Sequence, residues 1–287
     1  MLLFKSVELL QTFLQKKRKE GLKIGFAPTM GALHRGHASL IEKAKLENDI
    51  CVCSIFVNPT QFNDPKDLEK YPRTEGKDIK ILVALDNDIL FYPTVDAVYP
   101  KNIHIPTFDF GQVDKVMEGK FRPGHFDGVV EVVYRLIDIV QPDRLYMGQK
   151  DFQQFTLIQH MLQQMQAKTK LVVCPIIREA DGLALSSRNV RLTPENRQRA
   201  PIIAKILHQL NDWIADGLSI KEAETKAIAE LSKMPDFRPE YLEIVDGHTL
   251  QPIEKMEDSD YVVVCTAVWT GDIRLIDNVI LKGNKRN

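Results

Sequence analysis

Two histidines lie three residues apart in a segment rich in proline and glycine near the amino terminus. The segment reads KIGFAPTMGALHRGHASLIEKA and contains His34 and His37. An apolar run ending at Ala27 precedes them and an amphipathic stretch follows, which predicts a strand, a loop and a helix beginning near His37. A helix amino terminus offers N–H groups and a positive dipole end to an anion, and imidazoles donate hydrogen bonds. The segment fits a phosphate site, although taken alone it fits an ordinary strand-to-helix turn better.

Amide side chains follow the next apolar run, Ile50–Val57. The sequence there reads VNPTQF and includes Asn58 and Gln61. Loops at the carboxyl ends of parallel strands line the ligand crevice, so both amides are placed to hydrogen-bond a polar substrate.

A lysine stands where a third apolar run, Arg144–Met147, gives way to a helical pattern in LYMGQKDFQQFTLIQHMLQQM. Lys150 lies at the predicted helix start, where a cation is unfavourable unless an anion lies beside it. Asp151 and Gln154 are three residues apart and share a face of that helix. An exposed lysine is the alternative interpretation.

Two further segments carry an arginine among small or polar residues. In FRPGHFDG, Arg122 and His125 form a basic loop that matches phosphate or carboxylate, although a surface turn fits nearly as well. In READGLALSSRNVRLT, the side chains of Ser186, Ser187 and Arg188 can wrap a phosphate chain. A pair of helix-capping serines beside a domain linker is the other interpretation of this segment.

The elements that must position these residues alternate between strands and helices. Helical patterns near 37–47, 74–86, 127–140 and 151–166 separate five candidate strands: Lys23–Ala27, Ile50–Val57, Asp88–Phe91, Arg144–Met147 and Leu171–Ile177. This alternation predicts an α/β domain with a parallel sheet that is covered on both faces.

The pattern of predicted helices and strands changes after Arg188. A helical stretch opens at Thr193-Pro194 and runs to about Gly217, a second follows from Ser219 to Ser232, and Pro235 and Pro239 then break the chain. The later segments YLEIVD, YVVVCTAVW and RLIDNVIL predict a few antiparallel strands. We therefore expect a smaller α+β domain, with a boundary near 177–188.

Composition places the chain among ordinary globular proteins. Of 287 residues, 44% are hydrophobic, and 38 basic side chains nearly balance 39 acidic ones, which favours neither a nucleic-acid nor a membrane partner. The amino terminus, MLLFKSVELLQ, predicts a helix and not a signal peptide, and no apolar run has the length of a membrane span.

Four cysteines lie inside apolar runs such as ICVCSIFV and LVVCPII. They are Cys51, Cys53, Cys174 and Cys265, and we expect buried thiols in strands, which fits a reducing cytoplasm. A metal site at Cys51 and Cys53 is the less favoured alternative, because a second Cys or His pair at ligand spacing is missing from the sequence.

These segments, in this order, resemble one family across essentially the whole chain. The motifs PTMGALHRGH, NPTQF, RPGHFDG, GQKDFQQ and READGLALSSRN, followed by YLEIVDGHTLQPI, resemble those of the pantothenate synthetases. The element from His34 to His37 is the HxGH motif shared with other nucleotidyl-transfer enzymes. NPTQF, GQKDFQQ and SSRN together are specific to this family.

The resemblance implies a Rossmann-like domain over 1–177 that binds ATP and pantoate, and a smaller α+β domain over 178–287 that closes over the active site. It implies an amide-forming ligase that condenses (R)-pantoate with β-alanine through pantoyl adenylate, giving pantothenate, AMP and pyrophosphate. Mg²⁺ is expected to bind mainly through the ATP phosphates rather than through a protein metal site. A cytoplasmic homodimer is expected, and the apolar strand Tyr261–Trp269 would otherwise need covering at a sheet edge.

The resemblance also assigns residues. His34, His37 and Lys150 would be catalytic, with His37 in a general-acid or charge-stabilising role, and Gln61 and Gln154 would bind pantoate, with Gln61 close to β-alanine. The implied ATP site consists of Met30, Gly31, Ala32, Leu33, His34, Arg35, Gly36, His37, Gly148, Gln149, Lys150, Asp151, Ile177, Leu185, Ser186, Ser187 and Arg188.

Two positions depart from the family pattern, which usually has methionine at Leu185 and glutamate at Gln149. The first is a tolerable apolar exchange, and the second changes local charge beside Lys150.

The alternative function is an HxGH nucleotidyltransferase that acts on a phosphorylated acceptor. The uncharged amides of Gln61 and Gln154 favour pantoate, because a phosphorylated acceptor calls for more cations. A nucleotide-sensing protein on the same fold is a third, less favoured reading.

Overall fold

The computed structural model describes residues 1–62 and 65–283, which form two compact units. The first unit contains Met1–Asp109, Arg122–Gly148 and Leu157–Cys174, and the second contains Phe110–Phe121, Gln149–Thr156 and the chain from Pro175 onward. Each unit therefore draws on segments that are distant in the sequence.

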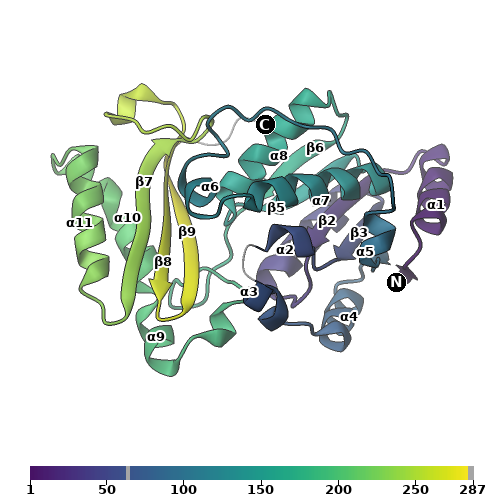
Figure 1. Ribbon diagram of the computed structural model, residues 1–287, viewed down its shortest axis with the longest axis horizontal. Helices are drawn as coiled ribbons and strands as arrows, with labels where there is room; N and C mark the ends of the chain where they lie inside the picture. Colours follow the sequence, from purple (N-terminus) through teal and green to yellow (C-terminus); the bar gives the residue numbers. More distant parts are fainter. Residues whose placement is uncertain (63–64, 284–287) are drawn as a thin grey trace. The chain divides into compact units, whose positions relative to one another are not determined.

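A six-stranded parallel sheet forms the centre of the first unit (Figure 1). Its strands are β1 (Leu2–Phe4), β2 (Ile24–Thr29), β3 (Ile50–Ile55), β4 (Ile89–Phe91), β5 (Arg144–Gly148) and β6 (Lys170–Cys174). Their spatial order is β1-β4-β3-β2-β5-β6, and all pairs are parallel. The chain winds outward from β2 to β4 and then outward from β5 to β6 on the other side. The winding direction thus reverses between β2 and β5, and sheets of this kind bind ligands at the carboxyl ends of such strands.

Helices cover both faces of this sheet. They are α1 (Val7–Lys19), α2 (Arg35–Glu47), η1 (Pro59–Gln61), α3 (Pro65–Lys70), α4 (Glu75–Ala84), α5 (Val95–Val98), α7 (His125–Val140) and α8 (Phe152–Gln164). Ile41 of α2 and Leu82 of α4 share a buried cluster with Ala27 of β2. The neighbouring Phe26 points to the opposite face and is also fully buried, and α7 packs against β2 and α1.

The second unit is built on an antiparallel sheet. Strands β7 (Phe237–Asp246), β8 (Val262–Thr270) and β9 (Ile273–Lys282) pair in that order, with β8 in the middle. One face packs on α10 (Ile202–Ala215) and α11 (Ile220–Ser232), and Leu207, Ala227, Val264 and Leu275 belong to the shared core. The shorter elements are α6 (Met117–Phe121), η2 (Asn189–Arg191), α9 (Pro194–Arg199) and η3 (Met256–Asp258).

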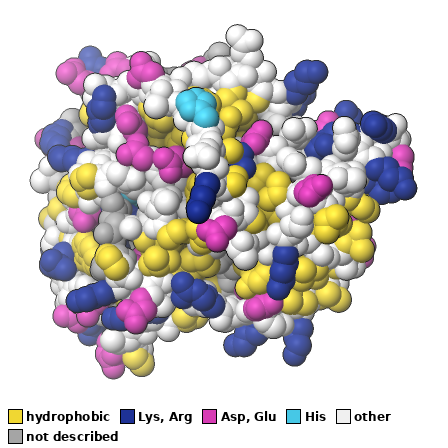
Figure 2. Space-filling model, turned by 45° about the vertical axis from the view of Figure 1, so that its right-hand side comes forward, with side chains coloured by type: hydrophobic (Ala, Val, Ile, Leu, Met, Phe, Trp, Pro, Cys, Tyr) yellow, Lys and Arg dark blue, Asp and Glu magenta, His cyan; other side chains and the backbone are white. Residues whose placement is uncertain are grey.

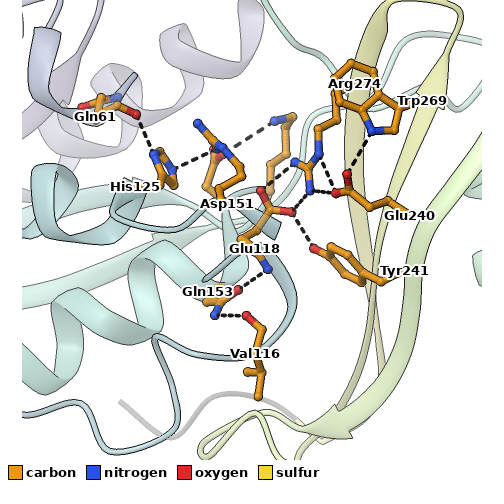
Figure 3. Close-up of polar contacts among 12 residues, drawn as sticks. Gln61, Val116, Glu118, His125, Asp151, Gln153, Glu240, Tyr241, Trp269 and Arg274 are labelled. Atoms are coloured by element: carbon orange, nitrogen blue, oxygen red, sulfur yellow. Dashed lines mark hydrogen bonds and ion pairs between the residues drawn. The ribbon is translucent and has the colours of Figure 1, made fainter. Parts of the chain in front are cut away.

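A buried ion network binds the segment around α6 to this sheet (Figure 3). Arg274 of β9 forms ion pairs with Glu118, at 2.7 Å, and with Glu240. Tyr241 donates a 2.8 Å hydrogen bond to Glu118, whose backbone N–H donates to the side chain of Gln153. Burial opposes a charge on Arg274, yet the two carboxylates raise its pKa. The guanidinium therefore stays charged between its two acidic partners, and removing one partner of such a buried pair would be costly.

Both signs of charge are interspersed over the face drawn in Figure 2, with apolar side chains between them. This mixture agrees with the near balance of 38 basic and 39 acidic residues. Among the described residues, no helix combines the length and apolar character needed to cross a bilayer.

The predicted fold class is confirmed: a parallel α/β sheet is followed by a small antiparallel sheet with helices. The five predicted strands correspond to β2 through β6. The last was predicted too long, because Pro175 lacks the N–H that would continue the pairing of β6.

Three other predictions were wrong in detail. The amino terminus begins with β1, which pairs with β4, and α1 starts only after the capping residue Ser6. The helix predicted from Thr193 to Gly217 is two helices that are separated at Pro201. Pro239 does not break the chain but lies within the edge strand β7, at a shift of register against β8.

The edge argument for a dimer was also wrong. The strand Tyr261–Trp269 corresponds to β8, which has a partner strand on each side. Its backbone is therefore paired within the chain and does not call for a second copy.

The four thiols should be unreactive in the native protein. Cys51, Cys53, Cys174 and Cys265 are buried and unbridged, and burial raises the pKa of Cys53 to about 12 and that of Cys174 to about 11. We expect negligible labelling by a disulfide reagent at about pH 8, and labelling of all four thiols in denaturant, because the thiolate is the nucleophile.

The same shifts give a pH dependence. The folded state keeps thiol protons that the unfolded chain releases above about pH 8.5, so the free energy of unfolding should fall as the pH rises beyond that value. Urea titrations at increasing pH measure this slope. Rapid labelling of the native protein would contradict the buried positions.

Candidate active site

The polar segments found in the sequence follow the carboxyl ends of neighbouring strands in the first unit. The histidine segment follows β2, the turn with Asn58 and Gln61 follows β3, and Gly148 ends β5. β2 lies between β3 and β5, so all three segments start from the same edge of the sheet.

The loop between β2 and α2 is folded around a buried carboxylate. Gly31 and Ala32 have φ angles of 79° and 48°, a conformation that turns successive N–H groups toward one point. Asp78 of α4 is 1% exposed and accepts from Ala32 N at 3.0 Å and from Leu33 N at 2.8 Å. Thr74 donates to the same carboxylate. These N–H groups are thus engaged within the protein, and a contact of Ala32 or Leu33 with ATP would use other atoms.

The two histidines cap the first turn of α2. His34 Nδ1 accepts from the Gly36 N–H at 3.1 Å, and His37 Nδ1 accepts from the His34 N–H at 3.3 Å. The ring centroids are 4.1 Å apart. A ring nitrogen that accepts a hydrogen bond carries no proton, so each neutral imidazole holds its proton on Nε2. The pair therefore places two imidazole rings side by side at a helix amino terminus, a position that suits an anion.

Gln61 lies beside Met30, so a residue assigned to pantoate contacts a residue assigned to ATP. Gln61 Nε2 donates to Met30 Sδ at 3.0 Å, and Asn58 Nδ2 donates to Gln61 Oε1 at 3.3 Å. Asn58 is fully buried, and Tyr99 donates to its Oδ1 at 3.1 Å. Burial raises the pKa of Tyr99 to about 12, so it remains a donor at neutral pH.

His125 holds the main chain of Gln61 (Figure 3). Its Nδ1 lies 2.8 Å from the Gln61 carbonyl oxygen, and its Nε2 lies 3.0 Å from Arg122 Nη1. A carbonyl accepts and a guanidinium donates, so Nδ1 carries the proton and Nε2 accepts. The sequence predicted Arg122 and His125 as an anion-binding loop, and it gave no indication of this positioning contact.

The other predicted residues lie in the second unit. Lys150 is largely buried and lies 3.7 Å from the exposed Asp151, while Gln154 is half-buried on the first turn of α8. The neighbouring Gln153 is buried and bonds the carbonyls of Val113 and Val116, a role the sequence did not reveal.

Ser186, Ser187 and Arg188 are half-buried in the loop before η2. The Arg188 N–H donates to Ser186 Oγ at 3.2 Å, and the Leu185 N–H donates to the Ile177 carbonyl at 3.0 Å. The loop thereby brings Ile177 close to the serines, as their shared assignment to ATP requires.

Comparison with known proteins identifies the family. The family model described as pantoate-beta-alanine ligase matches residues 2–280. The chain belongs to this family.

Relatives agree over nearly the full length. The pantothenate synthetase of Porphyromonas gingivalis is 50% identical over 280 residues, which cover 97% of this chain and 99% of that protein. The crystal structure of the Thermus thermophilus pantothenate synthetase matches with a TM-score of 0.91 at 38% identity, covering 98% of this chain and 100% of that chain. A Francisella tularensis pantoate-beta-alanine ligase, complexed with beta-gamma ATP and beta-alanine, matches with a TM-score of 0.81 at 37% identity, covering 98% of both chains. The family predicted from the motifs is confirmed.

Across residues 1–62 and 65–283, histidines, cysteines and carboxylates do not gather in groups of three that could hold a metal ion.

Gly128 should be essential for the position of Gln61. A Cβ at Gly128 of α7 would lie 2.5 Å from the Thr60 carbonyl oxygen and 2.7 Å from Gln61 N, so alanine must push the turn away. Gln61 is predicted to bind pantoate, and on that prediction Gly128→Ala should raise KM for pantoate about tenfold or more, since misplacement by about 1 Å can cost two orders of magnitude.

Gly76 provides the control. It is an exposed residue of α4, and the space around the position of a Cβ atom is open. Gly76→Ala should therefore leave KM unchanged and stabilise the helix by up to about 1 kcal/mol. Equal KM values for both variants would show that the contact with Thr60 does not position Gln61.

Proposed function

We propose that the protein condenses pantoate with β-alanine at the expense of ATP, forming pantothenate, AMP and pyrophosphate. Family membership supports this reaction, and so does the complex of the Francisella tularensis relative with beta-gamma ATP and beta-alanine. The observation that carries the mechanism is the position of the His34 and His37 rings, which lie side by side at the start of α2 and each accept a backbone N–H at Nδ1.

In the first step the pantoate carboxylate attacks the α-phosphorus of ATP, and the bond to the pyrophosphate oxygen breaks. Negative charge grows on the departing pyrophosphate, and fixed donors stabilise it without reorganising. His34 and His37 supply such donors in the first unit. Met30 and the residues Gly31–Gly36 shape the surrounding loop.

His37 acts as a charge-stabilising donor and not as a general acid. Its Nδ1 already accepts the His34 N–H, so loss of the Nε2 proton would leave an anionic ring with no proton on either nitrogen. A hydrogen bond to phosphate keeps the neutral ring and the helix cap together.

Residues of the second unit are proposed to bind ATP as well. Lys150 would contact phosphate and Asp151 the ribose, with Gln149 beside them. Gly148, which ends β5 in the first unit, is proposed to contact ATP too. Ser186, Ser187 and Arg188 would donate to phosphate oxygens, next to Leu185 and with Ile177 along the nucleotide. Arginine and hydroxyl donors match phosphate geometry. The nucleotide would enter as its Mg²⁺ complex, because magnesium keeps several waters and binds through phosphates.

In the second step the amine of β-alanine attacks the acyl carbon of pantoyl adenylate, and AMP leaves as the amide forms. Gln61 and Gln154 would hold pantoate through its hydroxyls and carboxylate. The Gln61 amide donates to the sulfur of Met30, a weak acceptor that a substrate oxygen can replace at little cost.

We further propose a cytoplasmic homodimer, for which sedimentation equilibrium gives the mass directly.

Product analysis tests the function. Steady pyrophosphate release should require pantoate, β-alanine and Mg–ATP together, and mass spectrometry should detect pantothenate and AMP in equal amounts. Release that depends instead on a phosphorylated acceptor would establish the nucleotidyltransferase alternative. ATP binding without turnover would point to a nucleotide sensor.

Two substitutions of His37 separate its two nitrogens. His37→Asn retains an acceptor near the Nδ1 position and removes the Nε2–H, so kcat should fall about 10²- to 10³-fold with little change in melting temperature. His37→Gln places an amide donor near Nε2, so it should retain more activity. The free energy of unfolding should fall by at most about 1 kcal/mol, because a glutamine at this third helix position can itself accept the His34 N–H. Single-turnover adenylation and thermal melts measure both, and wild-type turnover by His37→Asn would remove the Nε2–H from the mechanism.

A further inference from the structure

Two adjacent residues of β9, Asp277 and Asn278, are polar and almost fully buried, at 5% and 2% exposure. Successive side chains of a strand point to opposite faces of the sheet. Leu275 lies in the core with α10 and α11, so Asp277 shares that face, while Asn278 shares the face of Arg274. Each therefore reaches a different segment of the second unit.

Asn278 binds the main chain around Lys150. Its Nδ2 donates to the carbonyl oxygens of Gln149, at 3.0 Å, and Lys150, at 2.9 Å. Its Oδ1 accepts from Gln149 Nε2 at 3.1 Å. Both N–H groups of the amide are used, and they fix the carbonyls of the two peptide groups that flank the Cα of Lys150.

Asp277 binds the segment that leads to the serines. It forms two hydrogen bonds with Arg178, at 2.7 and 2.9 Å, and Arg178 also donates to the Gly182 carbonyl at 3.1 Å. Arg178 directly follows Ile177, and Gly182 lies four residues before Ser186. One dipeptide thus ties both segments of the second unit that are assigned to ATP.

We propose that Asn278 is a positioning residue for ATP, which acts by fixing the main chain of Lys150. The inference rests on the proposed function of Lys150 as a phosphate ligand. A lysine side chain has many rotamers, so its ammonium group is placed only as well as its backbone. Asn278 hydrogen-bonds to both carbonyls at that point and leaves the Lys150 side chain itself available to phosphate.

Direct binding and steady-state kinetics test the proposal. Asn278→Ala should raise both the Kd and the KM for ATP about tenfold, because all three hydrogen bonds of the Asn278 side chain are lost, and leave KM for pantoate within about twofold. Gln149→Met keeps both bonds from Asn278 Nδ2 and removes only the amide pair, so a smaller rise, about threefold, is expected. If Asn278→Ala fails to fold, the Kd of Gln149→Met for ATP still tests the proposal.

Thr266→Val is the matched control. Thr266 is a fully buried residue of β8 whose hydroxyl donates to the Tyr241 carbonyl, so the variant loses a buried hydrogen bond of the same sheet without touching Lys150. It should lower the melting temperature while KM for ATP stays within about twofold. Equal ATP affinities in the control and in Asn278→Ala would show that Asn278 is merely structural.

A double-mutant cycle with Lys150→Ala identifies the route. If Asn278 acts through Lys150, adding Asn278→Ala to Lys150→Ala should change the Kd for ATP by less than about twofold. Additive losses would overturn the proposal. A wild-type protein that binds ATP but forms no pantothenate would instead disprove the proposed function, and the cycle on ATP binding could still be read.

Discussion

The histidine site depends on the hydrogen bonds that the carboxylate of Asp78 accepts from the loop after β2. The loop after β2 turns the N–H groups of Ala32 and Leu33 inward, where they would be costly without acceptors. A buried carboxylate is also unfavourable unless it is hydrogen-bonded, so the loop and Asp78 stabilise each other. The start of α2 follows directly from this loop, and both imidazoles are placed by that start.

The same arrangement recurs at the other positions of interest. Gln61 is held through its carbonyl by His125, and Lys150 is held through its carbonyl by Asn278. In each case a buried polar side chain from a distant element binds main chain. The residues expected to meet substrate are therefore positioned through their main chain, and fixed positions of this kind are how preorganised sites limit reorganisation.

Local patterns predicted the parallel sheet and the segments at its carboxyl edge. Apolar runs bounded by proline and glycine gave β2 through β6, and the motifs after them gave His34, His37 and Gln61. The supporting residues were not predicted, because their partners lie 45 to 129 positions away in the chain. One indication was present for Asp78: it lies four residues before the buried Leu82 and so shares the apolar face of α4. The short strand β1 and the start of β7 around Pro239 were also missed, because these strands form through their pairing partners and not through local propensity.

The interleaving of the two units has a consequence for how the chain folds during synthesis. Glu118 pairs with Arg274, which is added 156 residues later, so the segment around α6 leaves the ribosome long before its sheet exists. Until β9 emerges, a carboxylate destined for burial must remain hydrated. The second unit is therefore completed only after β9 has been made, and a nascent chain that ends before β9 lacks the cation that pairs with Glu118.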